Sequence, residues 1–117
     1  NTEIHTIEWK PEGEVKAVLQ ICHGMVEYIK RYDEFAEFLC GKGFYVVGND
    51  HLGHGKSVQA KSEYGFFSEK YGNACVIGDI HTLRQRTMKE ALMQADGGCA
   101  RLALQKSFCG SFSCGKF

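Results

Sequence analysis

What the sequence lacks excludes several classes of protein. It has no net charge, because 14 Lys and Arg balance 14 Asp and Glu, so bulk electrostatics attracts neither nucleic acid nor an anionic membrane. No apolar run exceeds about five residues, whereas a membrane-spanning helix needs roughly 20, and the polar start NTEIHTIEWK has no signal-peptide pattern. We therefore expect a cytoplasmic chain with no transmembrane segment and no nucleic-acid partner.

The sequence also lacks a disulfide framework, since its six cysteines include no CxxC pair and follow no recognised spacing. We expect reduced thiols, with Cys22, Cys40 and Cys75 serving as small apolar residues within strand or helix patterns. The composition that is present, 44% hydrophobic and 24% charged over 117 residues, is globular. It suits one modest domain with a single core.

Three segments have the pattern of β-strands. Residues 5–9 alternate polar and apolar side chains, and Pro11 and Gly13 mark a turn before the apolar segment 15–22, which together predict a hairpin. Residues 44–48 are aromatic and β-branched. The apolar run within 15–22 is nearly continuous, as expected of a strand that is covered on both faces.

Two segments have helical periodicity. The first begins near residue 30, ends at Gly41 or Gly43, and places on one face Tyr32, Phe35, Ala36 and Leu39. The second spans residues 74–92, with one side apolar (Val76, Ile80, Leu83, Met88) and the other largely charged (Asp79, Arg84, Arg86, Lys89, Glu90). The order strand, helix, strand, helix predicts an α/β fold with parallel neighbouring strands and right-handed crossovers.

The string NDHLGHGKS, residues 49–57, ends like a nucleotide-binding loop. A GxxxxGKS loop needs a glycine five positions before its second glycine so that successive backbone N–H groups can wrap the phosphates. Asp50 occupies that position and would repel a phosphate, and no helical pattern follows Ser57 directly. The sequence therefore argues against a phosphate loop, although a nucleotide-binding protein remains a third hypothesis.

The same string contains candidate metal ligands in Asp50, His51 and His54. No fourth ligand is identifiable, and three such residues so close together more often form a turn in which side chains bond the backbone. Gly53 and Gly55 suit a turn that requires positive φ. We therefore predict a structural turn and no metal.

Two motifs taken together are specific. The segment HGMVEYIKRYDEFAEFLCGKGFYVVGNDHLGHGKS resembles the monoacylglycerol lipase and lysophospholipase branch of the α/β-hydrolases, in which a strand ending in HG is followed by a helix, a second strand and DxxGHGxS. The resemblance covers roughly the first 88 residues. It implies the N-terminal portion of an α/β-hydrolase fold over residues 1–90, with a mostly parallel sheet, and a structural turn shaped by Asp50, Gly53, His54, Gly55 and Ser57.

The resemblance also implies a chemistry. Acyl transfer at serine needs a nucleophile on a GxSxG elbow, a histidine base, an acid that orients it and two N–H donors for the oxyanion. The turn after HG supplies one donor in this family, which carries over to the backbone N–H of Met25, with His23 and Gly24 setting the turn. The implied substrate is a lipid or other small ester, and no cofactor is implied. An ordinary strand-ending turn without catalytic role remains the alternative.

Residues 91–117 depart from the family pattern. No GxSxG string occurs, and the nearest, Ser111 to Gly115, offers Ser113 with a poor strand before it and no helix after it. We therefore expect no triad and no activity from this chain alone, and hypothesise a shifted reading frame or a truncation behind the aberrant tail. The alternative is a small non-catalytic α/β binding module. Half a sheet would leave an unpaired edge through which copies could associate.

Overall fold

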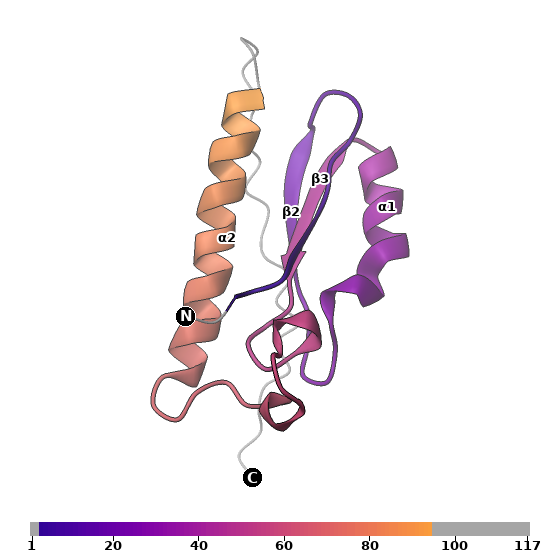
Figure 1. Cartoon of the computed structure of the whole chain (residues 1–117). Helices are drawn as coiled ribbons and strands as arrows, with labels where there is room; N and C mark the ends of the chain where they lie inside the picture. The colour runs from indigo at the N-terminus through magenta and orange to yellow at the C-terminus, as the bar shows by residue number, and fades with distance from the viewer. Residues whose placement is uncertain (1–2, 95–117) are drawn as a thin grey trace.

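A computed structural model describes residues 3–94 of the chain. A three-stranded sheet forms its centre, built from β1 (Thr6–Trp9), β2 (Ala17–Cys22) and β3 (Phe44–Asn49) (Figure 1). The strand order is β1-β3-β2, with β2 parallel and β1 antiparallel to β3. The prediction that the second and third strands are parallel neighbours is confirmed.

The predicted hairpin between the first two strands is wrong, because β3 lies between them. β3 is the most buried strand, buried from its second residue onward, and it has hydrogen-bonded neighbours on both edges. The turn at Pro11 and Gly13 reverses the chain as expected. It passes the start of β3 and connects two strands that do not pair with each other.

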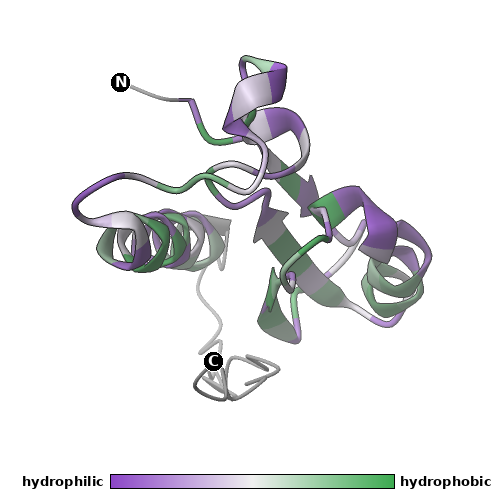
Figure 2. Ribbon diagram, turned by 90° about the horizontal axis from the view of Figure 1, so that it is seen from below, coloured by the Kyte–Doolittle hydropathy of each residue, from purple (hydrophilic) through white to green (hydrophobic). Residues whose placement is uncertain are grey.

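The helices flank the sheet on opposite faces. A 3-10 turn, η1 (Ile29–Tyr32), leads into α1 (Asp33–Gly41), and α2 spans Gly72–Gln94. Two short 3-10 turns, η2 (Gly55–Ser57) and η3 (Lys61–Glu63), lie in the connection after β3. Figure 2, which views the molecule from the end where β2 and β3 finish, shows α1 and α2 on either side of the strands. The predicted alternation of strands and helices is confirmed.

On the α1 face the core is built from Ile21, Ile29, Ala36 and Val46. The apolar stripe begins one turn earlier than the sequence suggested, at the fully buried Ile29, and continues through Tyr32, Ala36 and Leu39. Placing Phe35 on this face was therefore wrong, since its side chain is 52% exposed. Gly48 of β3 lies directly under Ile29, where a Cβ atom would collide with the isoleucine side chain.

On the α2 face Tyr45 and Val47 pack against Leu83 and Ala91. Polar contacts at the edge of this layer tie α2 to the strands: Arg86 pairs with Glu8 at 2.8 Å, and the Tyr45 hydroxyl donates to Glu90 at 3.2 Å. Glu90 is therefore half-buried, although the helical pattern placed it on the solvent side. Asp79 is likewise half-buried.

Helix α2 runs through position 90 to Gln94, the last described residue. The predicted tail, with Ser113, falls from residue 95 onward outside the described residues. The division of the chain into 1–90 and 91–117 therefore stays a prediction.

Candidate functional site

The two sequence motifs meet at one end of the sheet. Because β2 and β3 are parallel neighbours, their carboxyl ends lie side by side, and the chain leaves them through the His23 turn and the 49–57 turn. The His51 N–H donates to His23 Nε2 at 2.9 Å, and His51 Nε2 bonds the His23 carbonyl at 3.0 Å. This reciprocal pair joins turns that are 28 residues apart in sequence.

Three histidine rings pack together at this junction. The His23 ring centre lies 4.1 Å from that of His51 and 5.3 Å from that of His54, and all three residues are at most 9% exposed. Burial lowers the pKa of His23, and it lowers the pKa of His51 to about 4, helped by the neighbouring His23. Both rings are therefore neutral at pH 7. His51 Nδ1 is buried and has no partner within residues 3–94.

Asp50 is the hub of the second turn. One carboxylate oxygen accepts the Ile29 N–H at 2.7 Å. The other accepts the Lys56 N–H at 2.9 Å and contacts His5 Nδ1 at 3.1 Å. The side chain is 3% exposed, so these contacts replace the water it gives up. In a phosphate loop the Lys56 amide would have to donate to the phosphate. Here it already donates to the Asp50 carboxylate.

Ser57 and two glycines complete the turn around Asp50. The Ser57 hydroxyl donates to the Asp50 carbonyl at 2.7 Å and accepts the His5 N–H at 3.0 Å. Gly53 and Gly55 have φ of 74° and 51°, and a Cβ at either would collide, with the Phe66 backbone or with the Asp50 carboxylate. The five residues assigned to a structural turn therefore lie together, although their role in function stays a prediction.

In the His23 turn the adjacent amides of Gly24 and Met25 differ in their bonding. The Gly24 N–H is taken by Glu27 Oε2 at 2.9 Å, and the same oxygen accepts the Tyr32 hydroxyl at 2.8 Å. The Gly24 amide, followed by the Tyr32 hydroxyl, lowers the pKa of Glu27. Within the part of the chain that the structure describes, the Met25 N–H has no acceptor. Met25 is 79% exposed, and Val26 after it has a positive φ of 65°.

The sequence did not indicate several residues that organise this site. Glu27 holds the His23 turn against Tyr32, and His5, before β1, reaches both Asp50 and Ser57. The only sequence signal for Glu27 is an acid three positions after Gly24. Nothing in the sequence pairs His5 with a residue 45 positions away.

The aromatic residues between residues 64 and 71 divide into two groups. The Phe67 ring stacks on His54 with centres 5.5 Å apart, so it belongs to the packing of the histidines. Tyr64, Phe66 and Tyr71 are 63%, 52% and 70% exposed. These three form no buried apolar cluster in the structure.

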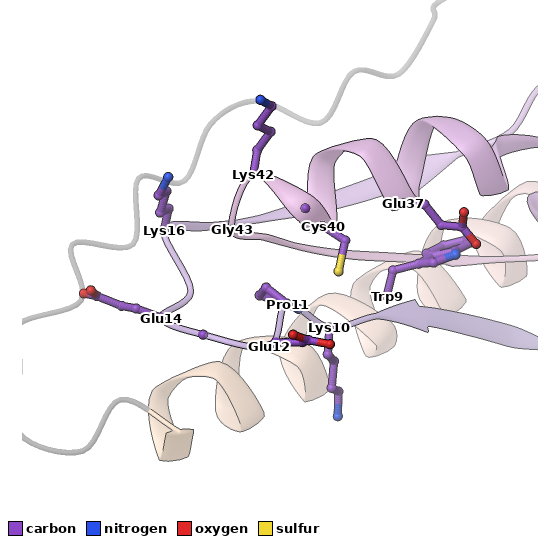
Figure 3. Close-up of a pocket in the computed structure, with 12 residues that line it drawn as sticks. Trp9, Lys10, Pro11, Glu12, Glu14, Lys16, Glu37, Cys40, Lys42 and Gly43 are labelled. Carbon is purple, nitrogen blue, oxygen red and sulfur yellow. The ribbon is translucent and has the colours of Figure 1, made fainter.

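A cavity lies at the opposite end of the sheet from the His23 turn. It has a volume of about 690 Å³ and is lined by the end of β1, the connection to β2 and the end of α1. Figure 3 shows Cys40 and Trp9 among positively charged lysine and negatively charged glutamate side chains. Since it adjoins the starts of β2 and β3, it is not part of the site formed where those strands end.

No group of three His, Cys, Asp or Glu side chains between residues 3 and 94 is arranged to share a metal ion. Over the same range, neither helix combines the length and the apolar character needed to span a bilayer.

The part of the sequence that contains both turns matches a known family. Residues 13–93 match the model of the serine aminopeptidase S33 family of hydrolases. The chain belongs to this family. Among curated proteins, the chain is similar to the human monoglyceride lipase, with 30% identity over 102 residues, which are 87% of this chain and 26% of the human protein. The vaccinia virus protein K6 is 38% identical over 73 residues, 62% of this chain and 90% of K6.

Solved structures show the same fold for this chain. A thermostable carboxyl esterase from Bacillus coagulans superposes with a TM-score of 0.68 at 26% identity, over 74% of this chain and 28% of the esterase. A lipase in its open form gives 0.64 at 34% identity, over 71% and 26%. The chain thus spans about a quarter of the human lipase and of these two structures, and it has the N-terminal part of an α/β-hydrolase fold of lipase or esterase type.

Proposed function

We propose that the His23 turn is the oxyanion-binding side of a serine ester hydrolase, with the Met25 N–H as one donor. The observation that carries this is the difference between two adjacent amides: Gly24's is bonded to Glu27, whereas Met25's is unbonded at an exposed turn. An oxyanion donor must be fixed in place and have no acceptor before the substrate arrives. Loss of one such donor typically costs about 3 kcal/mol of transition-state stabilisation.

The other turn residues support this donor from behind. His23 accepts the His51 amide and thereby fixes the end of β2 against the 49–57 turn. Asp50 in turn binds the Ile29 amide at the start of η1. We propose that His23, Gly24, Asp50, Gly53, His54, Gly55 and Ser57 position the donor and do not react.

We propose lipid esters as the substrate class, of the monoacylglycerol or lysophospholipid type, cleaved through an acyl-enzyme. Two observations support this. The human and mouse relatives are monoglyceride lipases, and the Met25 turn exposes the apolar side chains of Met25 and Val26, 79% and 88% exposed, beside the proposed donor. Apolar surface next to an oxyanion donor suits an acyl chain.

We propose that the 117-residue chain does not hydrolyse esters by itself, because it contains no GxSxG string. A fluorophosphonate probe, which reacts only with an activated serine, tests this. We expect no labelled protein by intact mass. A stoichiometric adduct that maps to Ser113 would overturn the proposal and establish an active serine.

The alternative is a non-catalytic α/β binding module. It is favoured by one comparison: the 73 residues of protein K6 that match are 90% of its length, so this relative is shorter than the present chain. Both hypotheses predict no labelling, but only the first predicts that a chain supplying the elbow, acid and histidine gains esterase activity on mixing. If mixing restores nothing, the binding module is favoured.

We also propose a cytoplasmic protein without a nucleic-acid partner, and a tail distinct from the hydrolase part that lies within residues 91–117. The zero formal charge supports the absence of a nucleic-acid partner. Self-association through the outer edge of β2 is proposed as well, because no strand within residues 3–94 pairs with that edge.

A further inference from the structure

A small cavity separate from the His23 turn lies between the sheet and α2. Its volume is about 140 Å³, and its walls include Asn49 at the end of β3, Thr6 of β1, and Asp79, Thr82 and Arg86 of α2. The sheet and α2 leave a gap here that their side chains do not fill. What the cavity can bind depends on which of these polar groups lack partners.

Asn49 contributes an acceptor with no donor. The residue is 1% exposed, and its Nδ2 group donates to the Asp50 carbonyl at 3.3 Å. Its Oδ1 atom has no hydrogen-bond partner among residues 3–94. A buried carbonyl oxygen left unsatisfied is destabilising, so the site favours a donor brought from outside.

Asp79 contributes a second acceptor, and it carries charge. The side chain is half-buried, burial raises its pKa, and no cation pairs with it within the described part of the chain. Arg86 lines the same cavity, but its guanidinium is bonded to Glu8 at 2.8 Å and lies 3.8 Å from Glu90. The Thr82 hydroxyl donates its proton to the Gly78 carbonyl at 2.8 Å.

We propose that this cavity binds a primary ammonium group, with Asp79 supplying the negative charge and Asn49 Oδ1 a neutral acceptor. Two acceptors without donors match a head group that has three N–H donors and one positive charge. A calcium or magnesium ion needs about six oxygen ligands and usually more than one carboxylate. Leu83, in the same wall, gives apolar contact for a short carbon chain.

The test uses the full chain and methylammonium chloride as the probe. We expect methylammonium to lower the midpoint of the Asp79 carboxyl titration, followed by carbon-13 NMR, because a bound cation favours the carboxylate. It should also raise Tm in proportion to the logarithm of its concentration. Sodium chloride, magnesium chloride and tetramethylammonium chloride at matched ionic strength should produce neither effect, since none of them offers N–H donors.

Two variants separate this site from general salt effects. Asp79→Asn should abolish the methylammonium-dependent rise in Tm, whereas Glu69→Gln, which removes an exposed carboxylate, should retain it. A Tm rise of equal size in Asp79→Asn would overturn the proposal, as would an Asp79 titration that methylammonium leaves unchanged. If the variant fails to fold, the wild-type titration alone decides. An equal response to sodium or magnesium would contradict the ammonium assignment.

Discussion

At the scale of single residues, the contacts between the two turns depend on His23 and His51 remaining uncharged. His51 is enclosed by His23 and His54 and uses its Nε2 proton to bond the His23 carbonyl. A second proton on this ring would place a charge in a site with few acceptors and beside another imidazole. The neutral state of His23 and His51 is therefore part of what holds the two turns together.

We predict that the protein loses stability as pH falls from about 6.5 to about 4. The pKa of His51 is near 4 in the folded chain and 6.5 when unfolded, so the unfolded state binds more protons throughout this window and is favoured by acid. The full shift corresponds to about 3 kcal/mol, lost within the window and constant below it. Urea unfolding at a series of pH values measures this.

Two variants identify the residue responsible. His51→Gln keeps an N–H donor but cannot titrate, so the decrease between pH 6.5 and 4 should become smaller. His81→Gln, at an exposed position on α2, should leave it unchanged. An unaltered pH dependence in His51→Gln would assign the acid sensitivity to other groups.

At the scale of elements, the position of η1 over the sheet depends on close approach at one glycine. Gly48 of β3 lies against the Ile29 side chain, and Ile29 also donates its amide to Asp50. The same contact therefore packs η1 on the sheet and connects it to the 49–57 turn. This fixes the chain that follows the proposed oxyanion donor.

We predict that Gly48→Ala destabilises the protein by about 1–3 kcal/mol through overpacking. The double variant Gly48→Ala with Ile29→Ala should show a favourable coupling energy, because removing the isoleucine δ-carbon makes room for the new methyl group. Denaturant unfolding of the four proteins measures the coupling.

Gly78→Ala is the matched control. It lies in α2, where nothing beyond the adjacent residues and the backbone of the helix comes within 4 Å of the added carbon, so it should stabilise the protein by about 0.5–1 kcal/mol. Additive effects of the Gly48 and Ile29 changes would contradict close packing at this contact.

At the scale of the whole molecule, the two edges of the sheet differ. β1 carries Glu8, which pairs with Lys10 at 3.3 Å and with Arg86 at 2.8 Å, and charge of this kind protects an edge from pairing. β2, with the sequence AVLQIC, carries no charge, proline or glycine. The Lys16 amide points to β3, so by alternation the backbone groups of Ala17, Leu19 and Ile21 point to the outer side.

We predict concentration-dependent self-association through β2 and its weakening in Ala17→Pro. Proline at the first residue of an edge strand removes one outward N–H without a loss to the β2–β3 ladder. We expect the dissociation constant to rise about tenfold, equivalent to about 1.4 kcal/mol. Sedimentation velocity over a concentration series measures it.

Thr6→Pro makes the corresponding change at the start of β1 and should leave self-association unchanged. A wild-type chain that remains monomeric at every concentration would contradict the prediction. Equal effects of the two proline variants would place the interface elsewhere.

Local sequence patterns predicted much of the fold, because the residues that form each strand, helix or turn signal lie close together in the sequence. The apolar runs at 15–22 and 44–48 became the parallel pair, and the glycines at 53 and 55 have the positive φ that their turn requires. The order of HG and DxxGHGxS, a resemblance of sequence, indicated the family that the comparisons then showed.

Only the tertiary structure decided what depends on contacts between distant residues. β3 lies between β1 and β2, where both of its edges are hydrogen-bonded. The turn sequences do not specify this strand order, because they do not show which strands will pair. Ile29 replaced Phe35 in the core because a 3-10 turn before α1 shifts the apolar stripe. Packing of separate elements creates the bonds from Asp50 to Ile29 and His5. It also creates the cavity lined by Asn49 and Asp79. Local sequence patterns cannot predict these features, because the residues involved are far apart in the chain.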